Sequence, residues 1–326
     1  MDTVKIGIIG TGWIAEKMAI TLEGMEGVEA YAVASRQLQT ACDFADRWGF
    51  TRAYGSYEEM LDDEEVELVY IATPHSHHFE HARMSLLKGK AVLCEKAFTA
   101  NARQAEELLN LAKEKELFIT EAIWTRYMPL SHTINDLVTS GIIGRPMTLS
   151  ANLGYPIGNR ERLRQPALAG GALLDLGVYA LNFASMVFGT EVERVTSTCV
   201  KTDTGVDAQN SITLTFKDGK IAVLHSSMLS MTDRQGIISG DKGHLIIENI
   251  NNPQRIRVVT EDYKTAVVYN CPPQITGYEY QVYASMEALR NGWLESPYMP
   301  HAETLRIMRM MDDLRREWGV HYPADE

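Results

Sequence analysis

The chain has 326 residues, of which 45% are hydrophobic, and this predicts about two domains with ordinary cores. Its formal net charge of -12 argues against a nucleic-acid partner, because binding a phosphate backbone requires a concentrated basic face. The opening MDTVKIGIIG has too short an apolar run for a signal peptide, and no later stretch approaches the ~20 apolar residues of a membrane span. Four scattered cysteines without a CxxC pair favour a reducing compartment. We therefore expect a cytoplasmic protein with a small-molecule substrate and no membrane partner.

The first 121 residues alternate short β-branched runs with longer, helix-patterned runs, which is the order of βαβ units. The strands are expected at residues 4–10, 28–35, 66–73, 91–94 and 117–122. One of the intervening helices is expected from Asn101, an N-cap candidate. The pattern predicts an N-terminal Rossmann domain, a doubly wound parallel sheet within residues 1–125.

From residue 146 the spacing changes, and apolar runs follow one another with turn sequences such as Lys217-Asp218-Gly219 between them. Strands are expected at residues 147–154, 192–201, 210–219, 220–229, 244–250, 255–260 and 265–270. Succession without intervening helices is typical of antiparallel pairing. We predict a C-terminal α+β domain, residues 126–326, built on a large, mostly antiparallel sheet.

The first strand runs into a GxGxxA sequence that opens a helix. In a dinucleotide-binding turn the first glycine permits the bend and the second lets a pyrophosphate approach the backbone. A plain strand-to-helix turn is the alternative, and the N-terminal position within βαβ order favours the nucleotide interpretation. The expected cofactor contacts here are Gly10, Thr11, Gly12, Trp13 and Ile14.

The second strand ends in Ser35-Arg36, where an NAD enzyme usually has an acidic residue for the ribose 2′-hydroxyl. Arginine pairs well with a 2′-phosphate, and the repelling carboxylate is missing. The alternative is a solvated arginine at the start of the next helix. We predict NADP rather than NAD as the cofactor.

The later strands also end in polar residues, and the carboxyl ends of parallel strands form the ligand-binding edge of such a sheet. The cofactor-binding candidates there are Thr73, Pro74, His75, His78, Glu95 and Lys96. The histidines of this stretch, with His77 and His81 four residues apart, also suggest a metal site. No nearby carboxylate pattern completes one, so no metal is expected.

A third group of candidates lies in the sequence GGALLDLGVY, whose apolar residues continue with helical spacing. Asp175 and Tyr179 are four residues apart and hence on one helix face. A buried tyrosine beside a carboxylate is also an ordinary structural feature, so the spacing leaves catalysis and structure open.

The residues considered so far resemble the glucose-fructose oxidoreductase and inositol dehydrogenase (Gfo/Idh/MocA) family. The similarity covers essentially the whole chain, through GIIGTGWIA, ATPHSHH, CEKAFTANA, EAIWTRYMP and AGGALLDLGVYALNFASMVFG. Within the family, the sequence looks most like the branch of dihydrodiol dehydrogenases and NADP-dependent D-xylose dehydrogenases. The resemblance implies a Rossmann domain followed by an open-faced sheet domain that often forms a dimer interface.

By resemblance, the catalytic set is Lys96, Asp175 and Tyr179. The family motif commonly runs Glu-Lys-Pro with a cis peptide, whereas Ala97 replaces the proline here. A cis bond to a non-proline residue is costly, so we expect either a trans bond or a cis bond maintained by its surroundings.

The working hypothesis is that Tyr179 takes the proton of a carbinol while hydride moves to the nicotinamide. A tyrosine in water titrates near pH 10, and a neighbouring ammonium group, assigned to Lys96, favours the phenolate. In the alternative, Lys96 itself is the acid or base. Trp124, Arg126 and Tyr155 are candidates for lining the substrate pocket, with simple packing as an equal alternative.

The sequence thus predicts an NADP-dependent dehydrogenase of a cyclic polyol, either an aldose such as D-xylose or a trans-dihydrodiol. The alternatives are a reductase of a keto-sugar of the anhydrofructose type, an inositol dehydrogenase, and a non-catalytic NADP-binding regulatory protein. A homodimer through the C-terminal sheet is expected, because apolar side chains of its strands remain available on the face away from the helices.

Overall fold

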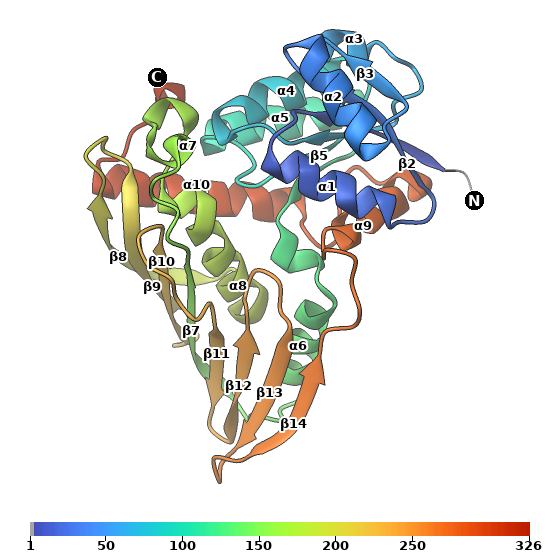
Figure 1. The fold of residues 1–326 in the computed structure, drawn as a ribbon. Coiled ribbons are helices and arrows are strands. Elements are labelled where there is room, and N and C mark those ends of the chain that lie inside the picture. The colour runs from blue at the N-terminus through green and yellow to red at the C-terminus, as the bar shows by residue number, and fades with distance from the viewer. Residues whose placement is uncertain (1–2) are drawn as a thin grey trace. The chain divides into compact units, whose positions relative to one another are not determined.

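The computed structural model describes residues 3–326, which form two compact units (Figure 1). The first unit contains the chain up to Ile123 and residues Gln274–Arg309. The second contains Trp124–Pro273 and Met310–Glu326. A division of the chain at residues 125 and 126 does not anticipate that residues 274–309 return to the first unit.

The first unit is built on a six-stranded sheet in the order β3-β2-β1-β4-β5-β6, with every pair parallel. Its strands are β1 (Val4–Ile9), β2 (Val28–Ala34), β3 (Arg52–Tyr54), β4 (Leu68–Ile71), β5 (Ala91–Glu95) and β6 (Ile119–Ala122). All residues of β4 and β5 are buried, so both faces of the sheet centre are covered. The predicted Rossmann sheet is confirmed; β3 was not expected, because three residues carry no recognisable pattern.

Helices connect these strands, namely α1 (Trp13–Glu23), α2 (Leu38–Trp48), α3 (Tyr57–Leu61), α4 (His75–Leu87) and α5 (Ala102–Lys115). The expected N-cap of α5 is present, since the Asn101 side chain accepts a hydrogen bond from the Gln104 amide at 3.0 Å. Ser56 caps α3 in the same way through the Glu59 amide. Local capping residues therefore fix where these helices begin.

Residues 274–309 carry α9 (Glu279–Asn291), which packs against β5, and the first half of α10 (His301–Trp318). The Glu279 carboxylate accepts hydrogen bonds from the backbone amides of Ile275, Thr276 and Gly277, which fixes the turn before α9. A ring nitrogen of His301 lies 2.9 Å from the carbonyl oxygen of Ile119 in β6. These contacts explain the return of this segment to the first unit.

The second unit begins with η1 (Trp124–Tyr127) and α6 (Pro129–Thr139) and contains an eight-stranded sheet. Its order is β14-β13-β12-β11-β7-β10-β9-β8, and only β7 and β10 pair in parallel. The strands are β7 (Pro146–Gly154), β8 (Val192–Lys201), β9 (Asp207–Phe216), β10 (Ile221–Ser227), β11 (Gly236–Gly240), β12 (Gly243–Glu248), β13 (Arg255–Thr260) and β14 (Thr265–Asn270). The predicted mostly antiparallel sheet is confirmed. We did not expect β11, whose sequence GIISG is bounded by glycines.

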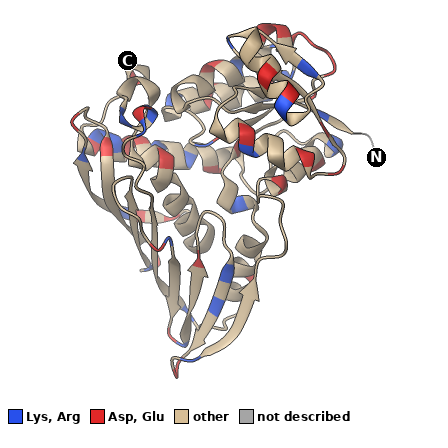
Figure 2. Ribbon diagram, in the orientation of Figure 1, with Lys and Arg blue, Asp and Glu red and all other residues tan. Residues whose placement is uncertain are grey.

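One face of this sheet packs against α8 (Val178–Phe188), which contacts β7 and β10. The other face exposes apolar side chains among the described residues, including Val223 (47% exposed), Ile221, Val200 and Val268. Strands β10, β11 and β14 contain no charged residue, and Figure 2 shows them in tan. The face away from α8 is therefore partly apolar and nearly uncharged along these strands.

The remaining short elements of the second unit are α7 (Glu161–Arg164), η2 (Pro166–Leu168), a π-helical turn η3 (Leu173–Gly177) and η4 (Pro323–Asp325). The helical run Pro166–Phe188 is long and apolar enough to cross a membrane by length and composition alone. However, 89% of its apolar window is buried inside the protein, which is typical of a core helix.

Candidate active site

The GxGxxA sequence forms the turn between β1 and α1. Gly10 has φ +104, a conformation that favours glycine, and an added Cβ would lie 3.1 Å from the Ala72 carbonyl oxygen. Gly12 is the N-cap of α1, has extended backbone angles and no side-chain capping bond, and nothing lies within 4 Å of a Cβ placed on it. The first turn of α1 therefore offers backbone amides beside open space, which suits a pyrophosphate. Thr11 lies between the two glycines, and Trp13 and Ile14 are the first two residues of α1.

Ser35 and Arg36 directly follow β2, as predicted, and Arg36 is exposed. The Ser35 amide donates to the Tyr54 carbonyl oxygen at 3.2 Å. Burial lowers the pKa of His81 in α4 to about 4, and the charges of neighbouring histidines and of Arg36 act in the same direction. The end of β2 thus presents an arginine and no carboxylate, the combination that suits a 2′-phosphate.

His78 joins the ends of β4 and β5. Its Nδ1 lies 2.8 Å from the Ala97 carbonyl oxygen and its Nε2 lies 2.8 Å from the Thr73 carbonyl oxygen. Two facing acceptors favour the doubly protonated ring, but complete burial, with a smaller contribution from the charge of Lys96, lowers the pKa of His78 to about 4. We take the desolvation of a fully buried ring as the larger effect, so His78 is neutral at pH 7.

Hydrogen bonds fix nearly every residue of the segment that follows β5. The Lys96 amide donates to Glu95 Oε2 at 3.2 Å, the Phe98 amide donates to Glu121 Oε1 at 3.1 Å, and Tyr70 Oη donates to Glu95 Oε1. The Lys96–Ala97 peptide bond is cis, the second of the two expected possibilities. Lys96 therefore stands at the carboxyl end of β5 on a fixed backbone.

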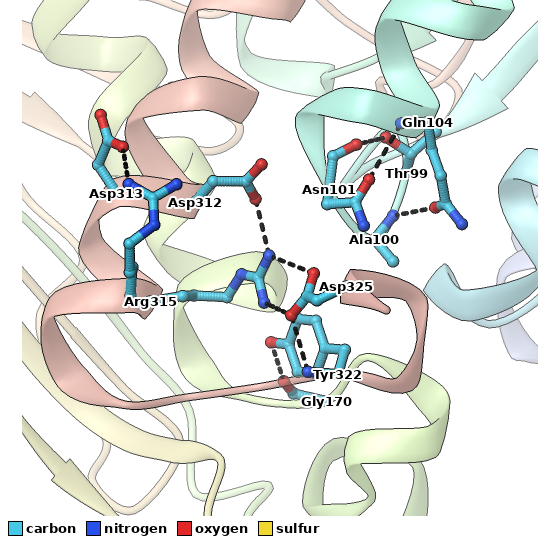
Figure 3. Close-up of polar contacts among 11 residues, drawn as sticks. Thr99, Ala100, Asn101, Gln104, Gly170, Asp312, Asp313, Arg315, Tyr322 and Asp325 are labelled. Carbon is cyan, nitrogen blue, oxygen red and sulfur yellow. Dashed lines mark hydrogen bonds and ion pairs between the residues drawn. The ribbon is translucent and has the colours of Figure 1, made fainter.

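The same segment continues into the cap of α5 (Figure 3). The Ala100 amide donates to Gln104 Oε1 at 3.2 Å, and Thr99 Oγ1 donates to the Asn101 carbonyl oxygen at 2.7 Å. The first unit consequently gathers the glycine turn, His75 at the start of α4, the Thr73-Pro74 segment and the Glu95-Lys96 pair on the carboxyl edge of one sheet.

In the second unit, Asp175 and Tyr179 lie on one continuous helical run, Asp175 in η3 and Tyr179 in α8. Between them the Val178 amide bonds to the Leu173 carbonyl oxygen, so the first turn is wider than an α-turn. Both residues are buried, at 5% and 6% exposure, and Arg162 donates to Asp175 Oδ1 at 3.1 Å. Sequence reasoning missed Arg162, because nothing distinguishes it from the other basic residues of that loop.

The three pocket candidates have structural contacts of their own. Arg126 Nε donates to Asn182 Oδ1 of α8 at 2.5 Å. Tyr155 Oη accepts from Arg234 at 3.1 Å, and Trp124 opens η1. These contacts leave their relation to a substrate a prediction. Within residues 3–326 no group of three or more His, Cys, Asp or Glu side chains is arranged to hold a metal ion.

Two family models match the chain. One, described as "Oxidoreductase family, NAD-binding Rossmann fold", covers residues 4–122, and the other, "GFO/IDH/MocA C-terminal domain", covers residues 131–246. The chain belongs to the Gfo/Idh/MocA oxidoreductase family. The resemblance noted in the sequence is confirmed, and so is the prediction of a nicotinamide-dependent dehydrogenase at the level of the family.

Members of the family resemble the chain over nearly its full length. Trans-1,2-dihydrobenzene-1,2-diol dehydrogenase of Mus musculus is 33% identical, with 99% of each chain covered. D-xylose 1-dehydrogenase (NADP(+)) of Hypocrea jecorina is 35% identical, with 98% of this chain and 93% of that protein covered. A 3-ketoreductase of Actinomadura kijaniata, solved with NADP and TDP-benzene, is 26% identical with a TM-score of 0.87 and covers 97% of this chain and 98% of its own.

Proposed function

We propose that the protein is an NADP-dependent oxidoreductase that transfers a hydride between the nicotinamide and a carbinol carbon of a cyclic polyol, either an aldose such as D-xylose or a trans-dihydrodiol. The observation that carries the proposal is the buried helical run with Asp175, Tyr179 and the arginine partner of Asp175. A regulatory protein that only senses NADP has no need of such a set. The names of the dihydrodiol and D-xylose dehydrogenases support the substrate class.

The cofactor choice is supported by the first unit. NADP would supply the hydride acceptor or donor at nicotinamide C4. The open amides at the start of α1 suit its pyrophosphate, and Arg36 suits its 2′-phosphate. An acidic residue at the end of β2, the usual partner of the NAD ribose, is missing.

The protein's own groups have the following proposed roles. Tyr179 exchanges a proton with the carbinol oxygen, and Lys96, as a cation, favours the anionic form of the oxygen that loses the proton. Asp175, fixed by Arg162, orients the tyrosine or accepts a hydrogen bond from a substrate hydroxyl. Trp124, Arg126 and Tyr155 are the candidates for holding the rest of the substrate.

The test is a panel of aldoses, inositols and trans-dihydrodiols assayed with NADP and with NAD on the wild type and three variants. Tyr179→Phe should keep its fold and its NADP affinity but lose about 10² to 10⁴ in kcat, the usual worth of a positioned acid or base. The matched control is Tyr263→Phe, a tyrosine that is 86% exposed, which should behave as the wild type. Activity of Tyr179→Phe within about threefold of wild type, combined with inactive Lys96→Met at every pH, would transfer the acid/base role to Lys96.

A second candidate function is reduction of a keto-sugar. The similarity to a 3-ketoreductase at 26% identity supports it. The groups proposed above would serve the reduction as well, because it is the reverse of the carbinol oxidation. Initial rates with NADPH and keto-sugars, compared with NADP and polyols, decide between the two directions.

We also propose a homodimer in the cytoplasm. The face of the eight-stranded sheet away from α8 exposes Val223, Ile221 and Val268 on strands that are short of charge, and water-exposed apolar patches of this kind commonly form interfaces. None of the four cysteines forms a disulfide bond in the part of the chain that the structure describes, as suits a reducing compartment. The mass of the protein in solution at micromolar concentration tests the dimer.

A further inference from the structure

A buried carboxylate lies at the start of the helical run that carries Asp175 and Tyr179. Asp207, the first residue of β9, has 0% exposure. Its Oδ2 accepts hydrogen bonds from the Leu173 amide at 2.7 Å and from Asn210 Nδ2 at 2.9 Å. Leu173 opens the π-helical turn, so its amide is one of the donors that a helix start leaves unpaired. Asp207 thus caps this helix from a distant strand.

The same carboxylate contacts the Gly170-Gly171 turn, which precedes the helix. Gly171 has φ +117, and a Cβ added to it would lie 2.2 Å from Asp207 Oδ1. Among the described residues Oδ1 has no hydrogen-bond partner. Asp207 and the turn therefore fit against each other without room for a side chain, and Oδ1 is the atom where a proton would sit without breaking a bond.

Residues from the end of the chain hold the other side of the turn (Figure 3). Tyr322 Oη donates to the Gly170 carbonyl oxygen at 2.5 Å, and the Arg315 guanidinium lies 4.3 Å from the centroid of the Tyr322 ring. Arg315 in turn bonds to Asp312 at 2.7 Å and to Asp325 at 2.7 Å. Contacts from β9 and from the segment after α10 consequently fix the Gly170-Gly171 turn.

We infer that Asp207 is a positioning residue of the proposed reaction, whose charged carboxylate holds the first turn of the helix that presents Asp175 and Tyr179. This inference rests on the proposed function of those two residues. A charged acceptor binds the Leu173 amide and the helix dipole more strongly than a neutral carboxyl does. Loss of the charge should loosen the turn and move both side chains from their working positions.

The charge of Asp207 changes near neutral pH. Burial raises its pKa to about 7, against the opposing hydrogen bonds from Asn210 and Leu173 and the charge of Arg315 on α10. Among the described residues, Asp207 also acts on the pKa values of Tyr322 and of Cys199 in β8, and Lys201 pairs with it across the β8–β9 ladder. Arg315 stays charged, and burial raises the pKa values of Tyr322 and Cys199, so both remain neutral near pH 7. Asp207 is then the member of this group that titrates in that range.

The experiment compares Asp207→Asn with the control Asp203→Asn, an exposed aspartate in the loop before β9. We expect Asp207→Asn to lose at least about tenfold in kcat with NADP affinity unchanged within about twofold, and Asp203→Asn to match the wild type in both. Hydrogen exchange of the peptide 171–180 in the wild type should slow about tenfold between pH 6 and pH 8, after correction for the intrinsic pH dependence of exchange. In Asp207→Asn this corrected difference should vanish. Unchanged kcat and an unchanged corrected pH dependence of exchange would overturn the inference.

A further variant, and the fact that hydrogen exchange needs no substrate, keep the result unambiguous. Should Asp207→Asn fail to fold, Tyr322→Phe provides a second variant, because it removes the hydrogen bond to Gly170. It should speed exchange of peptide 171–180 and lower kcat several-fold, and wild-type values would overturn the inference. Asp207→Asn keeps Tyr179, so a pH dependence of exchange that is lost in this variant belongs to Asp207. The exchange measurement requires no substrate. An inactive wild type with the expected exchange would therefore count against the proposed function and not against the hold of Asp207 on the helix.

Discussion

Replacement of Gly12 by alanine should separate cofactor binding from folding. The backbone at Gly12 has φ -83 and ψ -176, which any residue adopts, and nothing lies within 4 Å of the added Cβ. Alanine reduces the freedom of the unfolded chain, which stabilises by about 0.4 to 1 kcal/mol, but it is a poorer N-cap than glycine by a similar amount. The free energy of unfolding should therefore change by less than about 1 kcal/mol.

The same methyl group occupies the space through which a pyrophosphate would approach the amides of α1. Losing one charge-assisted hydrogen bond costs about 1.5 to 3 kcal/mol, so the NADP dissociation constant should rise at least about tenfold. Gly10→Ala provides the contrast. At φ +104 alanine is strained by about 1 to 2 kcal/mol, and its Cβ would lie 3.1 Å from the Ala72 carbonyl oxygen, so this variant should lose stability as well.

The assays are equilibrium unfolding in urea and a fluorescence titration with NADP on both variants. Gly12→Ala should unfold at the same urea concentration as the wild type but bind NADP weakly. Gly10→Ala should unfold at a lower urea concentration. If Gly12→Ala binds NADP as tightly as the wild type, or is destabilised as much as Gly10→Ala, then the pyrophosphate does not meet the helix at this residue.

Further variants test other parts of the protein. Arg36→Asp should reverse a preference of at least about tenfold for NADP over NAD, and equal dissociation constants in the wild type would contradict the assignment. His78 has a folded pKa of about 4 against about 6.5 in the unfolded chain, so the stability that it contributes is present above pH 6.5 and is lost as the pH falls toward 4. That loss is up to about 3 kcal/mol, and urea unfolding of His78→Gln should show a correspondingly flatter pH dependence. Val223→Glu on the exposed sheet face should give a monomer by light scattering, while the exposed Leu87→Glu of α4 should keep the wild-type mass.

Much of the fold follows from the sequence, because each predicted strand of the parallel sheet is a β-branched run bounded by turn residues. The two strands that escaped prediction had no such pattern. β3 spans only Arg52–Tyr54, and β11 is a five-residue strand with a glycine at each end. The return of Gln274–Arg309 to the first unit was equally hidden, since it depends on contacts such as that of His301 with the Ile119 carbonyl oxygen.

For the site, the sequence supplied residue types and the ends of strands but not the partners that fix them. Lys96 was recognised at the end of its strand, yet the bonds of His78 to Ala97 and of Glu121 to Phe98 join residues 19 and 23 positions apart. Arg162 as the partner of Asp175 had no distinguishing pattern either. Side-chain bonds to backbone atoms leave no periodicity in a sequence, so these contacts require the structure.

Asp207 shows why a sheet pattern conceals a buried charge. In a strand that alternates regularly, Asp207 shares a face with Gln209, which is partly exposed, while Ala208 and Asn210 point to the covered face. The structure nevertheless buries Asp207 completely. The pairing of β9 with β8 shifts register there, since Gln209 faces Val200 and Asp207 faces Lys201, so β9 has an extra residue. A bulge of this kind turns the neighbouring side chain toward a different side, here that of Asp207 toward the Leu173 amide. The position of the carboxylate therefore depends on this irregularity in the β8–β9 pairing.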